Sequence, residues 1–442
     1  MKAVRMTEGP LVRNIIAFAI PIALSGMIQQ LFNAADTAVV GRFADANALA
    51  AVGINGELIA FFICLSGGLA IGSNVLIANA IGRKDESGIS LAVHSSLCLA
   101  LLAGVLGMIA GLLVADHLLR LIDTPSSIFH LASVYLKLYF LGYPFLLVYD
   151  FGSAILRSHG DSRSPFLILL AAGVVNVVLN LVFVILFHMD VAGVAIATDI
   201  ATALSAVFVV YRLAGEEGPF RFRMGRLTLH GPSVSRILTI GIPAALQGAV
   251  FCLANIFVQA AVNTFGTTVV AGNTIALNYE YFTYYLITAF GQTATTFVSQ
   301  NWGAGNLKRC LKTAKDCLLL SLIGGFAINI PASLFYPLSA GLFSPDPAII
   351  KAASVRFLII VILEPLCSFI EVPAGFLRGL GHSTLPALWT ILGTCVLRIF
   401  WILTVFAQFH DIRVLYVVFP ISWILMGLLM LGSCWRVLRR RA

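Results

Sequence analysis

The sequence segment that determines the fold is LRSHGDSRSP, residues 156–165. A related segment, LRGLGHSTLP, occupies residues 377–386, 221 positions later. The two copies share Leu, Arg, Gly, Ser and Pro at the same five places. Pro144 and Pro365 keep the same offset, and Ile20-Pro21 recurs as Ile242-Pro243. The chain therefore contains an internal repeat of one structural unit.

The composition predicts a membrane protein. The chain has 442 residues, of which 59% are hydrophobic and 11% are charged, and its mean hydropathy is +0.96. A soluble domain carries about 25% charged residues. So little polar surface indicates that the protein is solvated by lipid. The eight cysteines show neither a C-x-x-C pair nor a metal-ligand spacing, so we interpret them as packing residues.

Twelve apolar stretches are long enough to cross a bilayer as helices, which requires about 20 residues each. They are residues 14–41, 48–81, 89–115, 131–156, 166–188, 191–213, 236–265, 268–301, 311–337, 352–377, 385–408 and 414–437. The sequence therefore predicts an all-α integral membrane protein with twelve transmembrane helices.

The basic residues predict the orientation, because cytoplasmic segments are enriched in Lys and Arg. With the N-terminus inside, inner segments hold 21 of the 28 basic residues and outer segments hold six. Both termini are thus expected in the cytoplasm, and the net charge of +8 reflects topology rather than nucleic-acid binding.

The repeat predicts two six-helix lobes, residues 1–215 and 236–442, joined by a cytoplasmic linker at residues 216–235. The stretch 215–235 is the longest polar segment of the chain. Because six is an even number, both lobes share one orientation, as in transporters built from parallel repeats.

A charged residue at membrane depth is a functional candidate by default. Asp36 lies in the outer half of the first span, and we expect it to bind a proton or cation. Asn176 and Asn180 share one face of the fifth span, and Thr198 lies in the sixth. These polar groups would hold the Asp36 carboxylate. The alternative is that all four residues form ordinary interhelical hydrogen bonds.

The second repeat has its own polar candidates. Glu280 and Arg398 lie at similar depth in the eighth and eleventh spans, and we expect them to pair, either structurally or in coupling. Tyr279 and Tyr281 flank Glu280 and would either bind a flat cation or pack.

Asp150 and Glu371 share the 221-residue offset. They would either line an inward-facing cavity that attracts organic cations or simply reach the membrane interface.

The chain contains no Walker A, H-E-x-x-H or G-x-S-x-G motif. The sequence therefore predicts neither an ATP site nor an enzyme, and no cofactor. Transport energy would come from an ion gradient or from the gradient of the substrate itself.

Several motifs resemble the multidrug and toxic compound extrusion (MATE) family across nearly the whole chain. They are Ile20-Pro21, residues 33–42 (NAADTAVVGR), residues 50–53 (AAVG), residues 82–85 (GRKD), residues 155–161 (ILRSHGD), residues 191–198 (VAGVAIAT), residues 291–305 and residues 377–381 (LRGLG). The resemblance implies a two-lobe antiporter that exports drugs or metabolites against inward H⁺ or Na⁺.

The resemblance also implies that Asp36, Asn176, Asn180 and Thr198 form an ion-coupling cluster. Some family members have an aspartate where this chain has Asn180, and sodium-coupled members carry an acid in the seventh span, where residues 236–265 contain none. These departures favour H⁺ over Na⁺.

We therefore expect a cation-coupled antiporter for organic, cationic small molecules, working by alternating access as a monomer in the plasma membrane. A lipid-linked oligosaccharide flippase of the same wider superfamily and an integral-membrane enzyme are the alternatives. The flippases usually have extra spans or a strongly basic cavity, which this sequence lacks. An enzyme would need a nucleophile–base or metal set.

Overall fold

The computed structural model describes residues 4–439 and divides into two compact units. Unit 1 contains residues 24–245, together with the first residues of the chain, and unit 2 contains residues 5–23 and 246–442. The boundaries fall inside the first and seventh helices, whereas the lobes expected from the repeat begin and end at the linker. The lobe boundaries remain a prediction.

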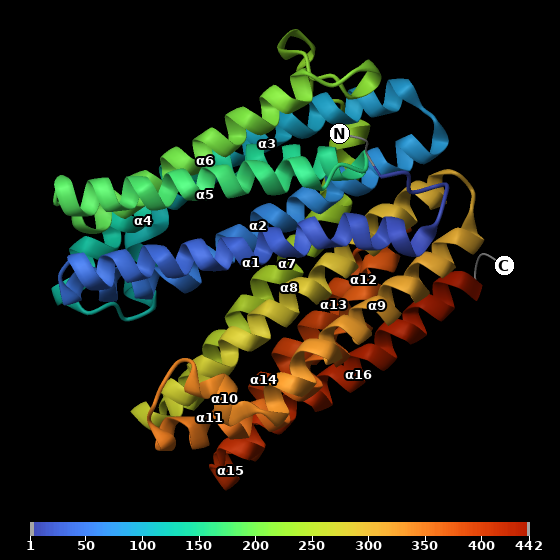
Figure 1. Ribbon diagram of the computed structural model, residues 1–442. Coiled ribbons are helices and arrows are strands. Elements are labelled where there is room, and N and C mark those ends of the chain that lie inside the picture. The colour runs from blue at the N-terminus through green and yellow to red at the C-terminus, as the bar shows by residue number, and fades with distance from the viewer. Residues whose placement is uncertain (1–3, 440–442) are drawn as a thin grey trace. The chain divides into compact units, whose positions relative to one another are not determined.

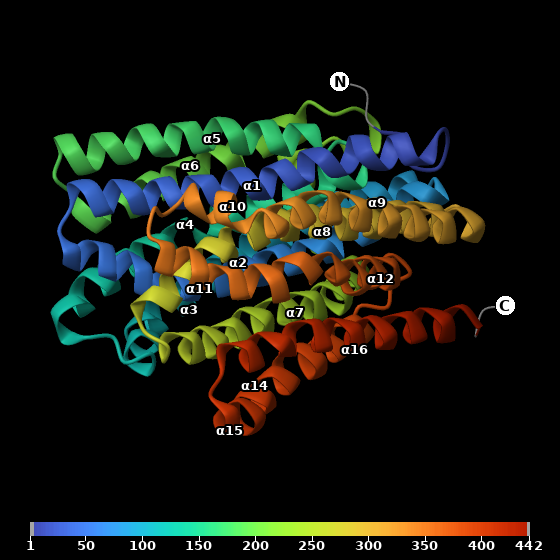
Figure 2. The same ribbon diagram turned by 60° about the horizontal axis from the view of Figure 1, so that its bottom comes forward.

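Long helices make up almost all of unit 1. Besides the second part of α1 (Leu11–Phe43), it contains α2 (Ala46–Arg83), α3 (Glu86–Leu121), α4 (Ser126–Ser158), α5 (Arg163–Leu181) and α6 (Asp190–Ala214), and it ends in the first part of α7 (Gly231–Asn263). A π-helical turn, η1 (Val182–Leu186), extends α5, and two 3₁₀ turns, η2 (Gly218–Phe220) and η3 (Met224–Arg226), lie in the linker. Helix α4 packs against α2, α3 and α6, and α5 runs beside α6 (Figures 1 and 2).

The helices of unit 2 are interrupted more often than those of unit 1. It contains α8 (Thr267–Gly303), α9 (Leu307–Leu334), α10 (Tyr336–Gly341), α11 (Pro347–Ile359), η4 (Val361–Cys367), α12 (Ser368–Gly379), α13 (Thr384–Thr390), η5 (Ile391–Val396), α14 (Leu397–Trp401), η6 (Ile402–Phe406), α15 (Ala407–Phe409) and α16 (Ile412–Arg439). Its core forms where α12 packs against α8 and α16, around Leu377, Tyr416 and Met426 (Figure 1).

The predicted spans correspond to the observed helices. Eleven helical stretches of the described residues are long and apolar enough to cross a membrane. The remaining predicted span corresponds to α8, a helix of 37 residues that is not among those eleven. The tenth span, predicted as one helix, is α11 and α12 joined by the 3₁₀ turn η4, which contains Pro365. Proline cannot donate the helical hydrogen bond, which explains the break.

The repeat is visible in the backbone of each unit. Lys84 and Gly305, which are 221 residues apart, both have positive φ angles (58° and 71°), and so do Gly160 and Gly381 (100° and 88°). After the first pair, Asp85 accepts a hydrogen bond from the N–H of Gly88 (2.9 Å) and caps α3. Asn306 caps α9 in the same way. The same turn therefore ends and restarts helices in both repeats.

Two histidines hold the linker on unit 1. His94 Nδ1 lies 2.7 Å from the carbonyl oxygen of Ser90, and His94 Nε2 accepts a hydrogen bond from the N–H of Arg223 (3.1 Å). A carbonyl oxygen only accepts, so Nδ1 is the donor and Nε2 is the acceptor for the linker. The His159 ring packs at a tilt of 48° against Phe220 with ring centres 4.2 Å apart, and burial lowers the pKa of His159 below the ordinary value of 6.5.

We predict that acidification loosens the linker. Above the ordinary histidine pKa of 6.5 the His159 ring is neutral and the packing is complete. Below it, a released linker leaves His159 free to bind a proton, whereas the packed linker resists protonation of this ring, so packing weakens as the pH falls. Hydrogen exchange of residues 216–230, corrected for intrinsic rates, should be faster at about pH 5.5 than at about pH 7.5.

A variant provides the control for this effect. His159→Phe keeps an aromatic ring against Phe220 and removes the titrating group, so the pH effect should shrink. Equal protection at both pH values in the unmodified protein would show that His159 does not control the linker.

Candidate ion-coupling site

Three helices of unit 1 bring the predicted polar residues together. Asp36 lies near the end of α1, Asn176 and Asn180 lie one turn apart on α5, and Thr198 lies on α6. Asn176 and Asn180 are buried, and Asp36 and Thr198 are partly buried. Helix α1 approaches α5 closely because Gly173 has no side chain where Phe32 of α1 packs.

The side-chain amides of Asn176 and Asn180 both contact the Asp36 carboxylate. Asn180 Nδ2 donates a hydrogen bond to Asp36 Oδ1. Asn176 lies between Asp36 and Thr198: with its Nδ2 directed at Asp36 Oδ1 (2.8 Å), its Oδ1 is 3.2 Å from Thr198 Oγ1. This orientation is set by the hydrogen-bond network, since an ionised carboxylate only accepts. The predicted cluster is thus assembled in one place.

Asn180 Oδ1 is the notable atom of the cluster. Asn180 is fully buried, and its Oδ1 has no hydrogen-bond partner among residues 4–439. A protonated Asp36 needs an acceptor for its O–H, and an amide that turns over presents this oxygen. The asparagines therefore offer donors to the ionised carboxylate and an acceptor to the protonated one.

A sodium ion would bind at this cluster only with the amide oxygens of Asn176 and Asn180 turned toward Asp36. Among residues 4–439, no group of three or more His, Cys, Asp or Glu residues is placed to hold a metal ion.

Glu280 does not pair with Arg398, so that prediction is wrong. Glu280 pairs with Arg356: Arg356 Nε donates to Glu280 Oε1 (2.5 Å) and Nη2 donates to Oε2 (2.7 Å). The Arg398 guanidinium instead lies over the Phe419 ring, with its carbon 4.0 Å from the ring centre. Its Nη2 is 3.4 Å from Ser422 Oγ. Arg356 holds both carboxylate oxygens of Glu280 in a bidentate pair, and Arg398 forms no ion pair with Glu280.

The sequence interpretation also missed a polar chain in unit 2. Glu364, on η4, is buried and accepts a hydrogen bond from Asn329 Nδ2 (3.2 Å), and Asn329 Oδ1 accepts from Thr283 Oγ1 (2.5 Å). Glu364 falls inside the span predicted at residues 352–377. Its proximity to Pro365, which breaks the helix, was the available signal.

The remaining candidates occupy separate places. Asp150 Oδ2 accepts a hydrogen bond from Ser66 Oγ (2.6 Å) in unit 1. Glu371 is partly buried in unit 2, within electrostatic range of Arg378. Tyr279 packs on Phe357, and its hydroxyl donates to the carbonyl oxygen of Ser339 (3.0 Å). Tyr281 is 39% exposed. The contacts of Tyr279 support the packing alternative for that ring.

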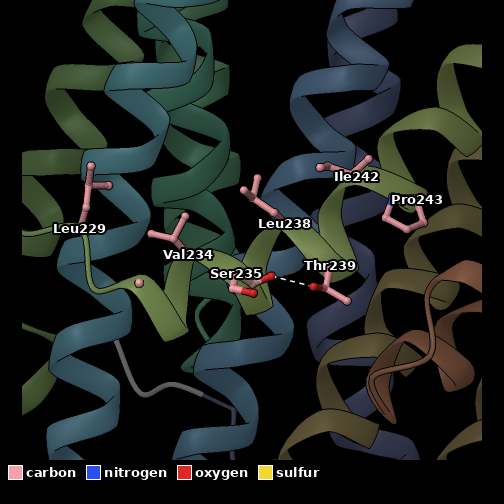
Figure 3. Close-up of a pocket in the computed structure, with 8 residues that line it drawn as sticks. Leu229, Val234, Ser235, Leu238, Thr239, Ile242 and Pro243 are labelled. Atoms are coloured by element: carbon pink, nitrogen blue, oxygen red, sulfur yellow. Dashed lines mark hydrogen bonds between the residues drawn. The ribbon is translucent and has the colours of Figure 1, made fainter.

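A groove of about 640 Å³ follows the first part of α7 (Figure 3). Apolar side chains such as Leu238 and Ile242 line it, and Thr239 Oγ1 donates to the carbonyl oxygen of Ser235 (2.7 Å). None of the predicted site residues lines this groove, so it is distinct from the Asp36 cluster.

Comparison with known proteins identifies the family. The MatE family model matches the chain twice, at residues 21–182 and 243–403. The chain belongs to the MATE family of multidrug efflux transporters. The two matches begin 222 residues apart, which confirms that the sequence contains the family unit twice. Members of this family are transporters and not enzymes.

Named relatives agree with this assignment. The probable multidrug resistance protein YpnP of Bacillus subtilis (strain 168) is 29% identical over 70% of this chain and 69% of its own length. The probable multidrug resistance protein NorM of Thermotoga maritima is 26% identical over 88% of this chain and 84% of its own. The FAD transporter of Shewanella oneidensis is 24% identical over 96% and 94%.

Solved structures share the fold. A MOP superfamily transporter from Pyrococcus furiosus superposes with a TM-score of 0.91 at 22% identity, covering 99% of this chain and 98% of that one. An outward-facing MATE family transporter gives a TM-score of 0.86 at 23% identity, covering 98% and 96%. This MATE transporter is therefore a multi-pass integral membrane protein, as predicted.

Proposed function

We propose that this MATE transporter exports organic cations in exchange for protons, with Asp36 as the proton-binding group. The observation that carries the proposal is the Asp36 cluster. Asn176 and Asn180 direct amide nitrogens at the carboxylate, and the buried Asn180 Oδ1 is free to accept a proton-bearing partner. Such a pair of amides accommodates a carboxylate before and after protonation.

The cycle follows from the charge on Asp36. A proton arriving from outside neutralises the carboxylate and weakens its hold on a cationic substrate, which leaves. Proton release to the cytoplasm restores the charge and allows the next cation to bind. Exchange requires only that proton and substrate favour different states of the transporter.

The proposed setting is the plasma membrane, with both termini cytoplasmic and the protein acting as a monomer. The excess of basic residues in the predicted inner segments supports this orientation. We further propose that the two repeats, residues 1–215 and 236–442, act as lobes joined by the linker and expose the substrate path to each side in turn.

The test uses purified protein in vesicles with separately imposed pH and Na⁺ gradients. We expect a fluorescent organic cation to be transported along a pH gradient in the complete absence of Na⁺. Transport that scales with Na⁺ and survives collapse of the pH gradient would overturn the choice of ion.

The charge of the substrate is tested in a separate set of transport measurements. One relative is named a FAD transporter, and FAD carries negatively charged phosphates. The same vesicles should therefore be offered a flavin nucleotide and a lipid-linked sugar. Transport of the cation alone supports the proposal, whereas transport of the lipid-linked sugar alone would favour a flippase.

A further inference from the structure

A second carboxylate in the membrane span of unit 1 is not used by the exchange described above. Asp199 lies in the middle of α6 and is partly buried. Its carboxyl group rests against the backbone of α4 at Gly142: a Cβ atom built on that glycine would come within 2.8 Å of Asp199 Cγ. A side chain at position 142 would therefore force the Asp199 carboxyl group to move.

Asp199 has no hydrogen-bonding or charged partner within the described part of the chain. Unlike Asp36, it accepts no hydrogen bond and forms no ion pair with any described residue, from residue 4 to residue 439. An ionised carboxylate without donors or a counter-ion is costly at membrane depth. The group is therefore suited to a state in which it carries a proton.

The titratable groups within electrostatic range of Asp199 come from α4. Tyr135 and Tyr139, one turn apart on α4, both lie within electrostatic range of Asp199. Tyr135 is also within range of Asp36 on α1. The two aspartates thus approach the same stretch of α4, and no cationic side chain of the described residues forms an ion pair with either of them.

We propose that Asp199 is a second proton-binding residue, so that each cycle returns two protons for one organic cation. The proposal rests on the proton exchange proposed for Asp36. The carboxyl group packs against Gly142 and has no donor or counter-ion among the described residues, which favours a proton as its ligand. Two protons entering for one monovalent cation leaving move one positive charge inward, so the membrane potential also drives transport.

The experiment measures stoichiometry in vesicles as the gradient at which net flux is zero. At zero membrane potential, a tenfold gradient of a monovalent cation is balanced by about half a pH unit for two protons, and by about one pH unit for one proton. We expect the unmodified protein to balance at the lower value and to respond to an imposed potential.

Variants of Asp199 and its neighbours test whether this residue carries the second proton. Asp199→Asn should balance at about one pH unit and lose its response to the potential, and Gly142→Ala should shift in the same direction because it displaces the carboxyl group. Asp190→Asn, which neutralises an aspartate at the start of the same helix, is the matched control and should not shift. An unchanged balance point in Asp199→Asn would overturn the inference, as would a weaker apparent substrate affinity at unchanged stoichiometry.

Proton exchange at Asp36 and the second proton at Asp199 can be refuted independently of each other. If Asp36→Asn still exchanges protons for the cation, the proposed function fails. If only Asp36→Asn is inactive and Asp199→Asn matches the unmodified protein, the exchange stands and the second proton does not.

Discussion

Substitution Asp36→Asn is expected to reduce proton-driven export to the level of protein-free vesicles. The amide keeps the shape of the carboxylate and still meets Asn176 and Asn180. It cannot bind and release a proton at any pH between about 2 and 12. Export of a fluorescent cation under an imposed pH gradient, normalised to the amount of protein in the membrane, measures the effect.

A matched variant separates charge at this site from charge in general. Asp45 lies at the start of α2, is exposed and makes no side-chain capping bond. Asp45→Asn should therefore export normally. If Asp36→Asn also exports at a near-normal rate while remaining dependent on the pH gradient, the cluster serves only packing.

The second large effect concerns stability. Neutralising either partner of the Glu280–Arg356 pair should lower the thermal unfolding midpoint of the detergent-solubilised protein sharply. Arg356 is 3% exposed, and its Nη1 also donates to Asn273 Oδ1 (2.6 Å), which accepts from the Tyr416 hydroxyl (2.8 Å). Breaking a buried pair of this kind costs about 3–5 kcal/mol, because the remaining charge is left without a partner.

The double variant provides the sharper test. Glu280→Gln and Arg356→Met should each destabilise more than the two changes together, since the double variant leaves no lone charge. Lys351→Met removes an exposed charge from the same helix, α11, and should leave the midpoint unchanged. A double variant that loses stability additively would show that the two residues act independently.

The fold was predictable because the sequence patterns that indicate it extend over many residues. A repeat of 221 residues and twelve apolar stretches survive errors of several residues at each end. The Asp36 cluster was also accessible, because Asn176 and Asn180 share a helix face and a lone carboxylate in an apolar helix needs polar neighbours. That part of the site follows from local spacing and from the resemblance to the MATE family.

The partner of Glu280 was not predictable for a physical reason. Equal depth does not fix which face of a helix a residue occupies, and Arg398 lies between two π-helical segments, η5 and η6. Each π-turn adds a residue and changes the direction of the side chains that follow. Arg356 lies near the start of the span predicted at residues 352–377, and in the structure it is buried against Glu280.

The most direct test of the central claim is substrate-induced proton release from the purified protein in Na⁺-free, weakly buffered detergent. If a proton on Asp36 is exchanged for the cationic substrate, adding that substrate should acidify the solution, as followed with a pH-sensitive dye. Asp45→Asn should release as many protons as the unmodified protein, and Asp36→Asn should release fewer. Equal release from Asp36→Asn, or release that appears only when Na⁺ is added, would contradict proton exchange at Asp36.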